Sequence, residues 1–153
     1  FSEIVVLNER IGAEIIALHR VESPARIVLK STRTHLTPWP ATGSAKVLLA
    51  FASPDEYEGL LSALTPTRYT ASTIVNLDLM RAHLKTVREV GYAISDEERD
   101  PDVWGASVPL FQGGECKHAL SVVGPKFRMP PETRAAIIEA LCVASRNISA
   151  QLS

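Results

Sequence analysis

Cysteine and long hydrophobic runs are scarce in this sequence. It contains two cysteines, Cys116 and Cys142, which are too few for a disulfide framework and lack the CxxC spacing of a zinc or redox site. No apolar run approaches the roughly 18 residues that a membrane-spanning helix needs, and no segment has the regions of a signal peptide. We therefore expect a reduced, cytoplasmic protein that makes no contact with a membrane.

An excess of positive charge is missing as well. The 153 residues include 16 Lys and Arg against 17 Asp and Glu, for a formal net charge of −1. The basic residues are dispersed from Arg10 to Arg146 without a run of like charges. Aromatic residues make up only 6%, too few for a platform on which bases stack. Because DNA binding needs cations that neutralise phosphates, we expect this chain not to bind DNA by itself.

The usual signatures of catalysis and metal binding are also missing. The four histidines are scattered without a metal spacing such as HExxH, and no serine lies in a GxSxG elbow. Residues 43–46 resemble a phosphate loop but lack the second glycine and the Lys-Ser/Thr ending of a Walker motif. The segment 95–100 clusters carboxylates, yet adjacent acids in a polar loop usually point apart into water. We therefore expect no enzyme, no metal and no cofactor.

What the sequence does contain is a set of strands and helices for one domain, residues 1–153. Hydrophobic residues make up 46%, enough for a single core. Strands are predicted at 3–7, 14–21, 25–30, 92–94, 104–111 and 116–123, with hairpin turns at 8–12 and 112–115. Helices are predicted between the two groups of strands and after residue 130. Grouped rather than alternating elements favour an α+β fold, a largely antiparallel sheet of about six strands with helices packed against it.

Capping residues mark where the predicted helices begin and end. Thr42 is a candidate N-cap for the first helix. Ser53 and Glu56 have the spacing of a capping box for the second. Asn76 precedes a third helix that Gly91 ends. The first of these helix starts also has a chemical meaning, because free N–H groups at a helix N-terminus attract anions and Gly43 would let a small carboxylate approach. The alternative for that place is an ordinary capped helix.

Four segments, in order, resemble the effector-binding domain of IclR-type bacterial transcription regulators. They are 20–23 (RVES), 38–47 (PWPATGSAKV), 87–98 (VREVGYAISDEE) and 119–125 (ALSVVGP). The resemblance implies a GAF-like fold whose cupped sheet holds a small-molecule effector. It also implies homodimers or dimers of dimers, with operator DNA bound through an N-terminal winged helix-turn-helix domain that is absent here. The chain begins at Phe1 rather than methionine, and we expect it to be part of a longer protein.

The resemblance also implies particular effector-binding positions. The backbone at Gly43 and Ser44 would hold a carboxylate, and the other polar contacts of family members match Ser95, Gly105, Ser121 and Val123. Small-acid sensors often have Asp, Cys, Ser and Ser at those four places, so this pocket is expected to be roomier and more apolar, for a larger carboxylate or an aromatic metabolite. The full set of candidates is Leu29, Trp39, Thr42, Gly43, Ser44, Ser95, Trp104, Gly105, Ser121 and Val123, with Leu29 and the tryptophans as walls.

Two other functions compete with effector sensing. A GAF-like enzyme or binding domain unrelated to transcription would use the acidic segment 95–100 and Ser121 as its active groups, but the sequence shows no base beside a nucleophile. A pure oligomerisation module would use Gly43 and Ser44 for helix capping only. Effector sensing accounts for the most motifs, and it is the function that we expect.

Overall fold

An antiparallel sheet forms the centre of the computed structural model, which describes residues 1–25 and 39–152. Within these residues the sheet has five strands in the order β2-β1-β5-β4-β3, and every neighbouring pair is antiparallel. The strands are β1 (Ile4–Ile11), β2 (Glu14–Val21), β3 (Ala93–Asp96), β4 (Val103–Gln112) and β5 (Glu115–Pro125). The predicted α+β class is confirmed. The strand expected at 25–30 lies, apart from Ala25, outside the described residues.

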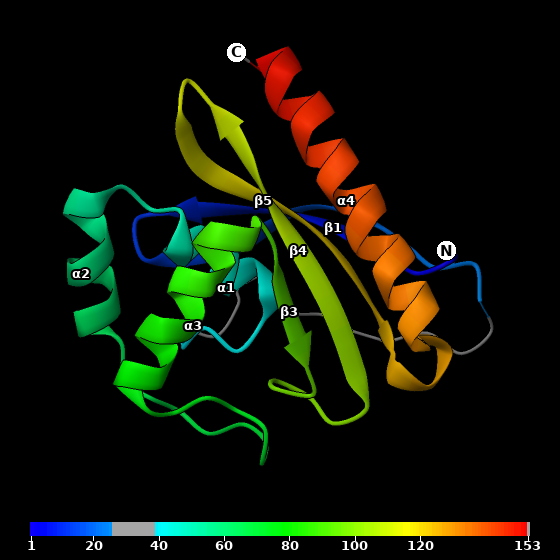
Figure 1. Ribbon diagram of the computed structural model, residues 1–153, viewed down its shortest axis with the longest axis horizontal. Helices are drawn as coiled ribbons and strands as arrows, with labels where there is room; N and C mark the ends of the chain where they lie inside the picture. The colour runs from blue at the N-terminus through cyan, green and yellow to red at the C-terminus, as the bar shows by residue number, and fades with distance from the viewer. Residues whose placement is uncertain (26–38, 153) are drawn as a thin grey trace.

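Helices cover both faces of this sheet (Figure 1). They are α1 (Gly43–Ala50), α2 (Pro54–Ala63), α3 (Leu77–Val90) and α4 (Pro131–Leu152), with a short 3-10 helix, η1 (Lys126–Arg128), before α4. The long α4 crosses β4 and β5, whereas α1 packs against the same two strands and against α3. Across residues 1–25 and 39–152, no helix combines the length and the apolar character that crossing a membrane requires.

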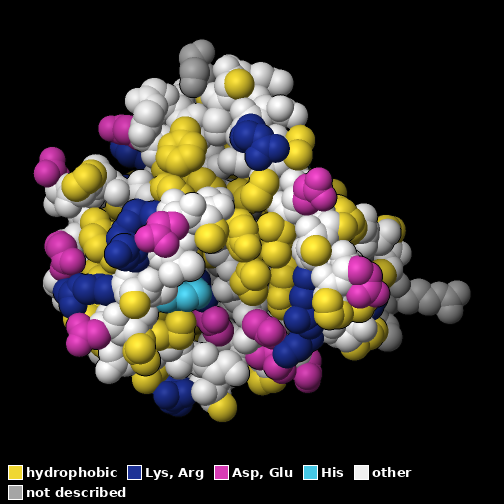
Figure 2. All heavy atoms as spheres, in the orientation of Figure 1, with side chains coloured by type: hydrophobic (Ala, Val, Ile, Leu, Met, Phe, Trp, Pro, Cys, Tyr) yellow, Lys and Arg dark blue, Asp and Glu magenta, His cyan; other side chains and the backbone are white. Residues whose placement is uncertain are grey.

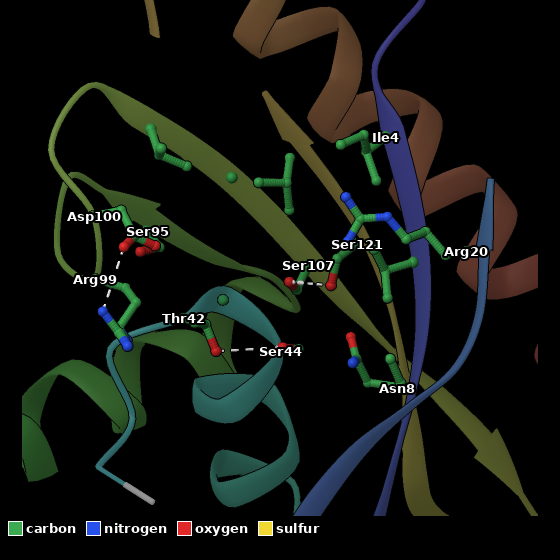
Figure 3. A pocket seen from close by; sticks show the side chains of 16 residues that line it. Ile4, Asn8, Arg20, Thr42, Ser44, Ser95, Arg99, Asp100, Ser107 and Ser121 are labelled. Atoms are coloured by element: carbon green, nitrogen blue, oxygen red, sulfur yellow. Dashed lines mark hydrogen bonds and ion pairs between the residues drawn. The ribbon is translucent and has the colours of Figure 1, made fainter. Parts of the chain in front are cut away.

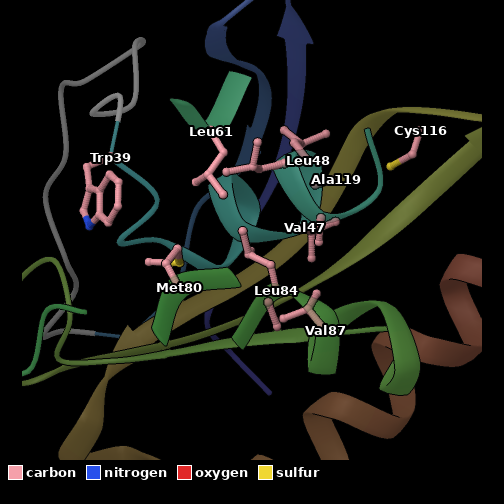
Figure 4. Packing of buried hydrophobic residues seen from close by; sticks show 12 residues of the cluster. Trp39, Val47, Leu48, Leu61, Met80, Leu84, Val87, Cys116 and Ala119 are labelled. Atoms are coloured by element: carbon pink, nitrogen blue, oxygen red, sulfur yellow. The ribbon is translucent and has the colours of Figure 1, made fainter. Parts of the chain in front are cut away.

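Alternation along the strands divides the interior into two hydrophobic clusters. In β4, Ala106 and Val108 belong to the cluster that α4 covers. Ser107 between them points to the opposite face, because successive side chains of a strand alternate. The cluster on that opposite face joins α1, α2 and α3, with Leu48, Leu61 and Leu84 fully buried (Figure 4). In Figure 2, hydrophobic side chains also lie at the surface over β3 and β4, between α3 and α4.

Local sequence signals place most helix ends correctly. The Thr42 hydroxyl accepts a hydrogen bond from the Ala45 N–H at 3.2 Å, and the Asn76 side chain accepts one from Leu79 at 3.0 Å. Gly91 ends α3 in a left-handed conformation, with φ of 85°. The predicted capping box at Ser53 is wrong, because its side chain makes no capping bond. Its carbonyl instead accepts the N–H groups of residues 56 and 57.

The turn between β1 and β2 was predicted too early in the chain. It lies at Gly12 and Ala13, with Gly12 at φ of 62°, so residues 8–11 continue β1. A β-bulge accompanies this longer strand. Leu7 pairs with His19 but Asn8 pairs with Ala17, so β2 has one extra residue opposite the junction. A bulge of this kind re-aims the side chains that follow it, and it brings β2 into the site described next.

Candidate functional site

A cavity of about 360 Å³ lies between the sheet and the start of α1. Its volume is within the range of small-molecule pockets in proteins. In Figure 3 the strands form one side of the cavity, here called the floor, and α1 with the loop after β3 forms the other. The cavity therefore lies on the sheet face opposite α4.

Strand register explains which residues make up the floor. One row across four strands contains Ser107 of β4, Ser121 of β5, Val6 of β1 and Arg20 of β2, each paired with the next. Paired residues of neighbouring strands point to the same face of a sheet. All four line the cavity, so the row has two hydroxyls at one end and a guanidinium at the other.

A second row lies beside the first. Ser95 of β3 pairs with Gly105, Gly105 with Val123, and Val123 with Ile4, and all four also line the cavity. The Ser95 hydroxyl donates to the Ala41 carbonyl at 2.7 Å, which attaches β3 to the segment before α1. The absence of a side chain at Gly105, together with the aliphatic groups of Val123 and Ile4, makes this row the apolar part of the floor.

The start of α1 lies directly above the two serines of the first row. The Ser107 and Ser121 hydroxyls are buried and 2.6 Å apart. A Cβ atom added to Gly43 would lie 2.6 Å from the Ser107 Oγ, closer than real side chains approach, so a side chain at this position would force Ser107 or α1 to shift. The first N–H groups of α1 have no carbonyl partner within the helix. This end of the cavity thus combines hydroxyls with a helix N-terminus, which favours an anion.

The loop after β3 closes the same end of the cavity with Arg99 and Asp100. Their side chains form an ion pair with 3.3 Å between Nη1 and Oδ1, and the Arg99 guanidinium lies 4.4 Å from the centre of the Tyr69 ring. The hydroxyls of Thr70 and Thr73 donate to two carbonyls of the loop, at 2.5 and 2.7 Å. The loop is therefore held in place by the segment that precedes α3.

A buried ion pair connects this loop to α1. The Lys46 ammonium, on a fully buried side chain, lies 2.5 Å from a carboxylate oxygen of Glu98 and donates to the Ile94 carbonyl at 2.8 Å. Burial lowers the pKa of Lys46 and raises the pKa of Glu98, while their mutual attraction opposes both shifts. This ion pair thus links the loop to α1 above the floor.

Comparison with known proteins identifies the family. Residues 1–150 match the family described as bacterial transcriptional regulator IclR C-terminal. The chain is an IclR C-terminal domain. The resemblance noted in the sequence is confirmed.

Curated relatives of this IclR domain are transcriptional regulators. KdgR of Escherichia coli is 30% identical over 139 residues, which cover 90% of this chain and 53% of KdgR. BhcR of Paracoccus denitrificans is 33% identical over 110 residues, 71% of this chain and 39% of BhcR. The chain therefore spans about half the length of these relatives, or less.

Solved structures agree with this assignment. The C-terminal domain of E. coli KdgR superposes with a TM-score of 0.84 at 28% identity, covering 99% of this chain and 88% of that one. IclR of Thermotoga maritima gives a TM-score of 0.90 at 25% identity, covering 99% of this chain and 62% of that one. The order of strands and helices described above is thus the fold of the family.

Seven of the ten predicted effector-binding residues of this IclR domain line the cavity. They are Thr42, Gly43, Ser44, Ser95, Gly105, Ser121 and Val123. Leu29 lies outside the described residues. The interpretation of the two tryptophans as cavity walls is wrong. Trp39 is buried among α1 and α3, where its Nε1–H donates to the Ile74 carbonyl at 2.6 Å (Figure 4). Trp104 belongs to the cluster beneath α4, because it alternates with Gly105 along β4.

Sequence reasoning missed several residues of the cavity, notably Asn8, Arg20, Arg99 and Ser107. Ser107 could have been found by alternation, because it lies two residues after the predicted contact Gly105 on the same strand. Pairing across the predicted hairpin would have placed it opposite Leu120, because the register shifts between Leu110 and Phe111. Asn8 and Arg20 could not have been found, because the predicted turn at 8–12 and the unpredicted bulge put both strands out of register.

The acids of segment 95–100 were expected to point into water, and that expectation is wrong for most of them. Glu98 pairs with Lys46, and Lys126 lies 2.9 Å from an Asp96 oxygen and 2.8 Å from a Glu97 oxygen. These carboxylates hold the loop in position. Among residues 1–25 and 39–152, no group of three or more His, Cys, Asp or Glu could hold a metal ion.

Proposed function

We propose that this domain is the effector-sensing part of a bacterial transcription regulator and that it binds a small organic acid in the cavity. One observation carries the proposal. The N-terminus of α1 and the paired hydroxyls of Ser107 and Ser121 face the same cavity, so an anion can be held noncovalently by preformed donors. The relatives named above are transcriptional regulators, and this supports a regulatory function.

The two rows of the floor indicate the size and chemistry of the effector. The carboxylate would accept hydrogen bonds from the backbone N–H groups of Gly43 and Ser44, while Ile4 and Val123 contact a carbon skeleton. A cavity of about 360 Å³ holds an acid larger than glyoxylate or pyruvate, either aliphatic or aromatic. The effector would leave unchanged. Covalent catalysis would need a base beside a nucleophile, and the sequence shows no such pair. No cofactor would take part.

Regulation would depend on parts of the protein outside this chain. An N-terminal DNA-binding domain would contact the operator in the cytoplasm, within a homodimer or a dimer of dimers. An effector changes DNA binding only if it binds two arrangements of the protein with different affinity. In this domain the element that would respond is α1 with its attached loop, since both lie against the effector and are joined by Lys46 and Glu98.

Calorimetry with the domain tests this function. Glyoxylate, pyruvate, hexanoate, adipate and benzoate are titrated into the wild-type chain, into Ser121→Ala and into Ser62→Ala, whose serine is exposed on α2. We expect binding of the larger acids, a loss of about 5- to 10-fold in S121A because one hydrogen bond is removed, and no change in S62A. Absence of binding to every acid would refute effector sensing in this cavity. Binding of the two smallest acids alone would refute the proposed size.

The same samples separate a sensor from an enzyme. After incubation with the domain, an acid that binds is recovered and its NMR spectrum recorded. An unchanged spectrum is expected of a sensor, whereas a converted product would favour the enzyme.

A further inference from the structure

The Asn8 side chain is a buried polar group that lines the cavity and has no partner in the protein. Only 3% of the residue is exposed, and it lies on the floor. Among residues 1–25 and 39–152, its amide makes no hydrogen bond. In Figure 3 the amide points from β1 into the cavity. A buried amide without a partner costs free energy, so a partner that enters from the cavity would stabilise the domain.

The other uncharged polar side chains of the lining already have partners within the protein. The hydroxyls of Thr42 and Ser44 lie 3.3 Å apart, and those of Ser107 and Ser121 lie 2.6 Å apart. The Ser95 hydroxyl donates to a backbone carbonyl at 2.7 Å. Within the described part of the lining, the asparagine is thus the uncharged polar side chain whose full hydrogen-bonding capacity remains for an effector.

Strand register places Asn8 close to the anion-binding end of the cavity. Asn8 pairs with Ala119, which comes two residues before Ser121 on β5. Diagonal neighbours of this kind lie about 7–8 Å apart, and their side chains bridge part of that distance. A carboxylate bound between α1 and Ser121 therefore has its second and third carbon atoms nearest to the amide.

We propose that the effector carries a hydroxyl group on carbon 2 or carbon 3 and that the Asn8 amide binds this hydroxyl. The inference rests on the proposed function and narrows it from organic acids in general to hydroxy acids. An amide presents N–H donors and a carbonyl acceptor, and a hydroxyl can pair with either of them. An alkyl group at the same place would leave the amide unpaired, which costs affinity. Asn8 is accordingly the residue that distinguishes a hydroxy acid from an unsubstituted acid of equal length.

Matched pairs of acids test the inference by calorimetry on the intact chain. Hexanoate is compared with 2-hydroxyhexanoate and 3-hydroxyhexanoate, and phenylacetate with mandelate, each hydroxy acid as separate enantiomers. We expect at least one hydroxy acid to bind about 5- to 10-fold more tightly than its unsubstituted partner, the gain typical of one hydrogen bond. In Asn8→Leu, which has a side chain of similar size without the amide, that advantage is lost while the affinity for the unsubstituted acid does not fall.

Melting curves separate recognition of the effector from a structural role of the amide. Because N8L removes a buried group that has no partner, the variant without ligand should melt no lower than the wild type. Asn147→Leu makes the same change at an exposed position of α4 and should keep the preference for the hydroxy acid. Asn8→Ala, which also removes the amide, serves in place of N8L if that variant does not fold.

Two kinds of result would overturn the role of Asn8 and leave acid sensing intact. One is equal affinity for hydroxylated and unsubstituted acids in the wild type, or a preference that N8L and N8A both retain. The other is a marked fall in the Tm of both variants, which would make the amide a structural group. Failure of every acid to bind would instead overturn the proposed function.

Discussion

Replacing Lys46 with methionine tests how much the buried ion pair between α1 and the loop contributes to stability. Methionine keeps most of the length of the side chain and removes its charge. Glu98, whose side chain is only 13% exposed, then loses a cation 2.5 Å away, and the Ile94 carbonyl loses a donor. We expect Lys46→Met to fold but to be markedly less stable.

The size of this effect follows from the burial of the pair. Removing one partner of a buried pair costs about 3–5 kcal/mol, because the other charge remains without compensation. Glu98 reduces this cost by taking up a proton, so we expect about 3 kcal/mol, or about 6–12 °C in Tm for a domain of this length. The pKa of Glu98 is already raised by burial and rises further without the cation. A raised carboxyl pKa contributes stability at low pH that is lost as pH rises, so the defect is larger at about pH 8 than at about pH 5.

Thermal unfolding followed by circular dichroism at both pH values measures the effect. Lys85→Met, at an exposed position of α3, makes the same chemical change and should leave Tm within about 2 °C of the wild type. The double variant K46M/E98L should recover much of the loss, because an apolar pair of similar volume is often as stable as a buried ion pair. A K46M protein that melts with the wild type at the higher pH would refute the reasoning.

Two further predictions concern the close approach at α1 and the half-buried His83. Gly43→Ala should cost about 1–3 kcal/mol, because its Cβ would lie 2.6 Å from the Ser107 Oγ. Adding Ser107→Gly should restore part of this in urea unfolding, whereas Gly59→Ala, which meets nothing within 4 Å, should not destabilise. Burial, aided by the charge of Lys46, lowers the pKa of His83 to about 4. Between about pH 6.5 and pH 4, His83 is therefore protonated in the unfolded chain but neutral in the folded one. The free energy of unfolding consequently falls as pH drops through this range. At about pH 5 this costs about 1 kcal/mol for a half-buried ring, and His83→Gln should remove that loss; an equal loss in both proteins would contradict the assignment.

The helix ends could be predicted because they depend on neighbouring residues, whereas half of the floor was predicted only through the family resemblance. Thr42 and Asn76 cap through donors three residues away, and Gly91 adopts the left-handed conformation that few other residues tolerate. Such signals act within one element, so the sequence alone contains them.

The rest of the site depends on register, which the sequence specifies weakly here. A shift of one residue moves every side chain of a strand to the other face. The bulge at Leu7 and the turn at Gly12 set the register of β1 and β2, so Asn8 and Arg20 were missed. The same rule explains the error at Trp104, because the lining position of Gly105 requires its neighbour to point toward α4.

Strand alternation also limits how an effector could act on the rest of the domain. In β5, Ser121 faces the cavity, while Val122 packs under α4. A rotation of Ser121 alone cannot move α4, because the two contacts lie on opposite faces of one backbone that is bonded to strands on both sides. Helix α1 is not part of the sheet ladder, and Lys46 with Glu98 joins it to the loop. The ion pair is therefore the element through which binding at α1 would displace the loop. Its removal in K46M should weaken acid binding even at temperatures where the variant remains folded.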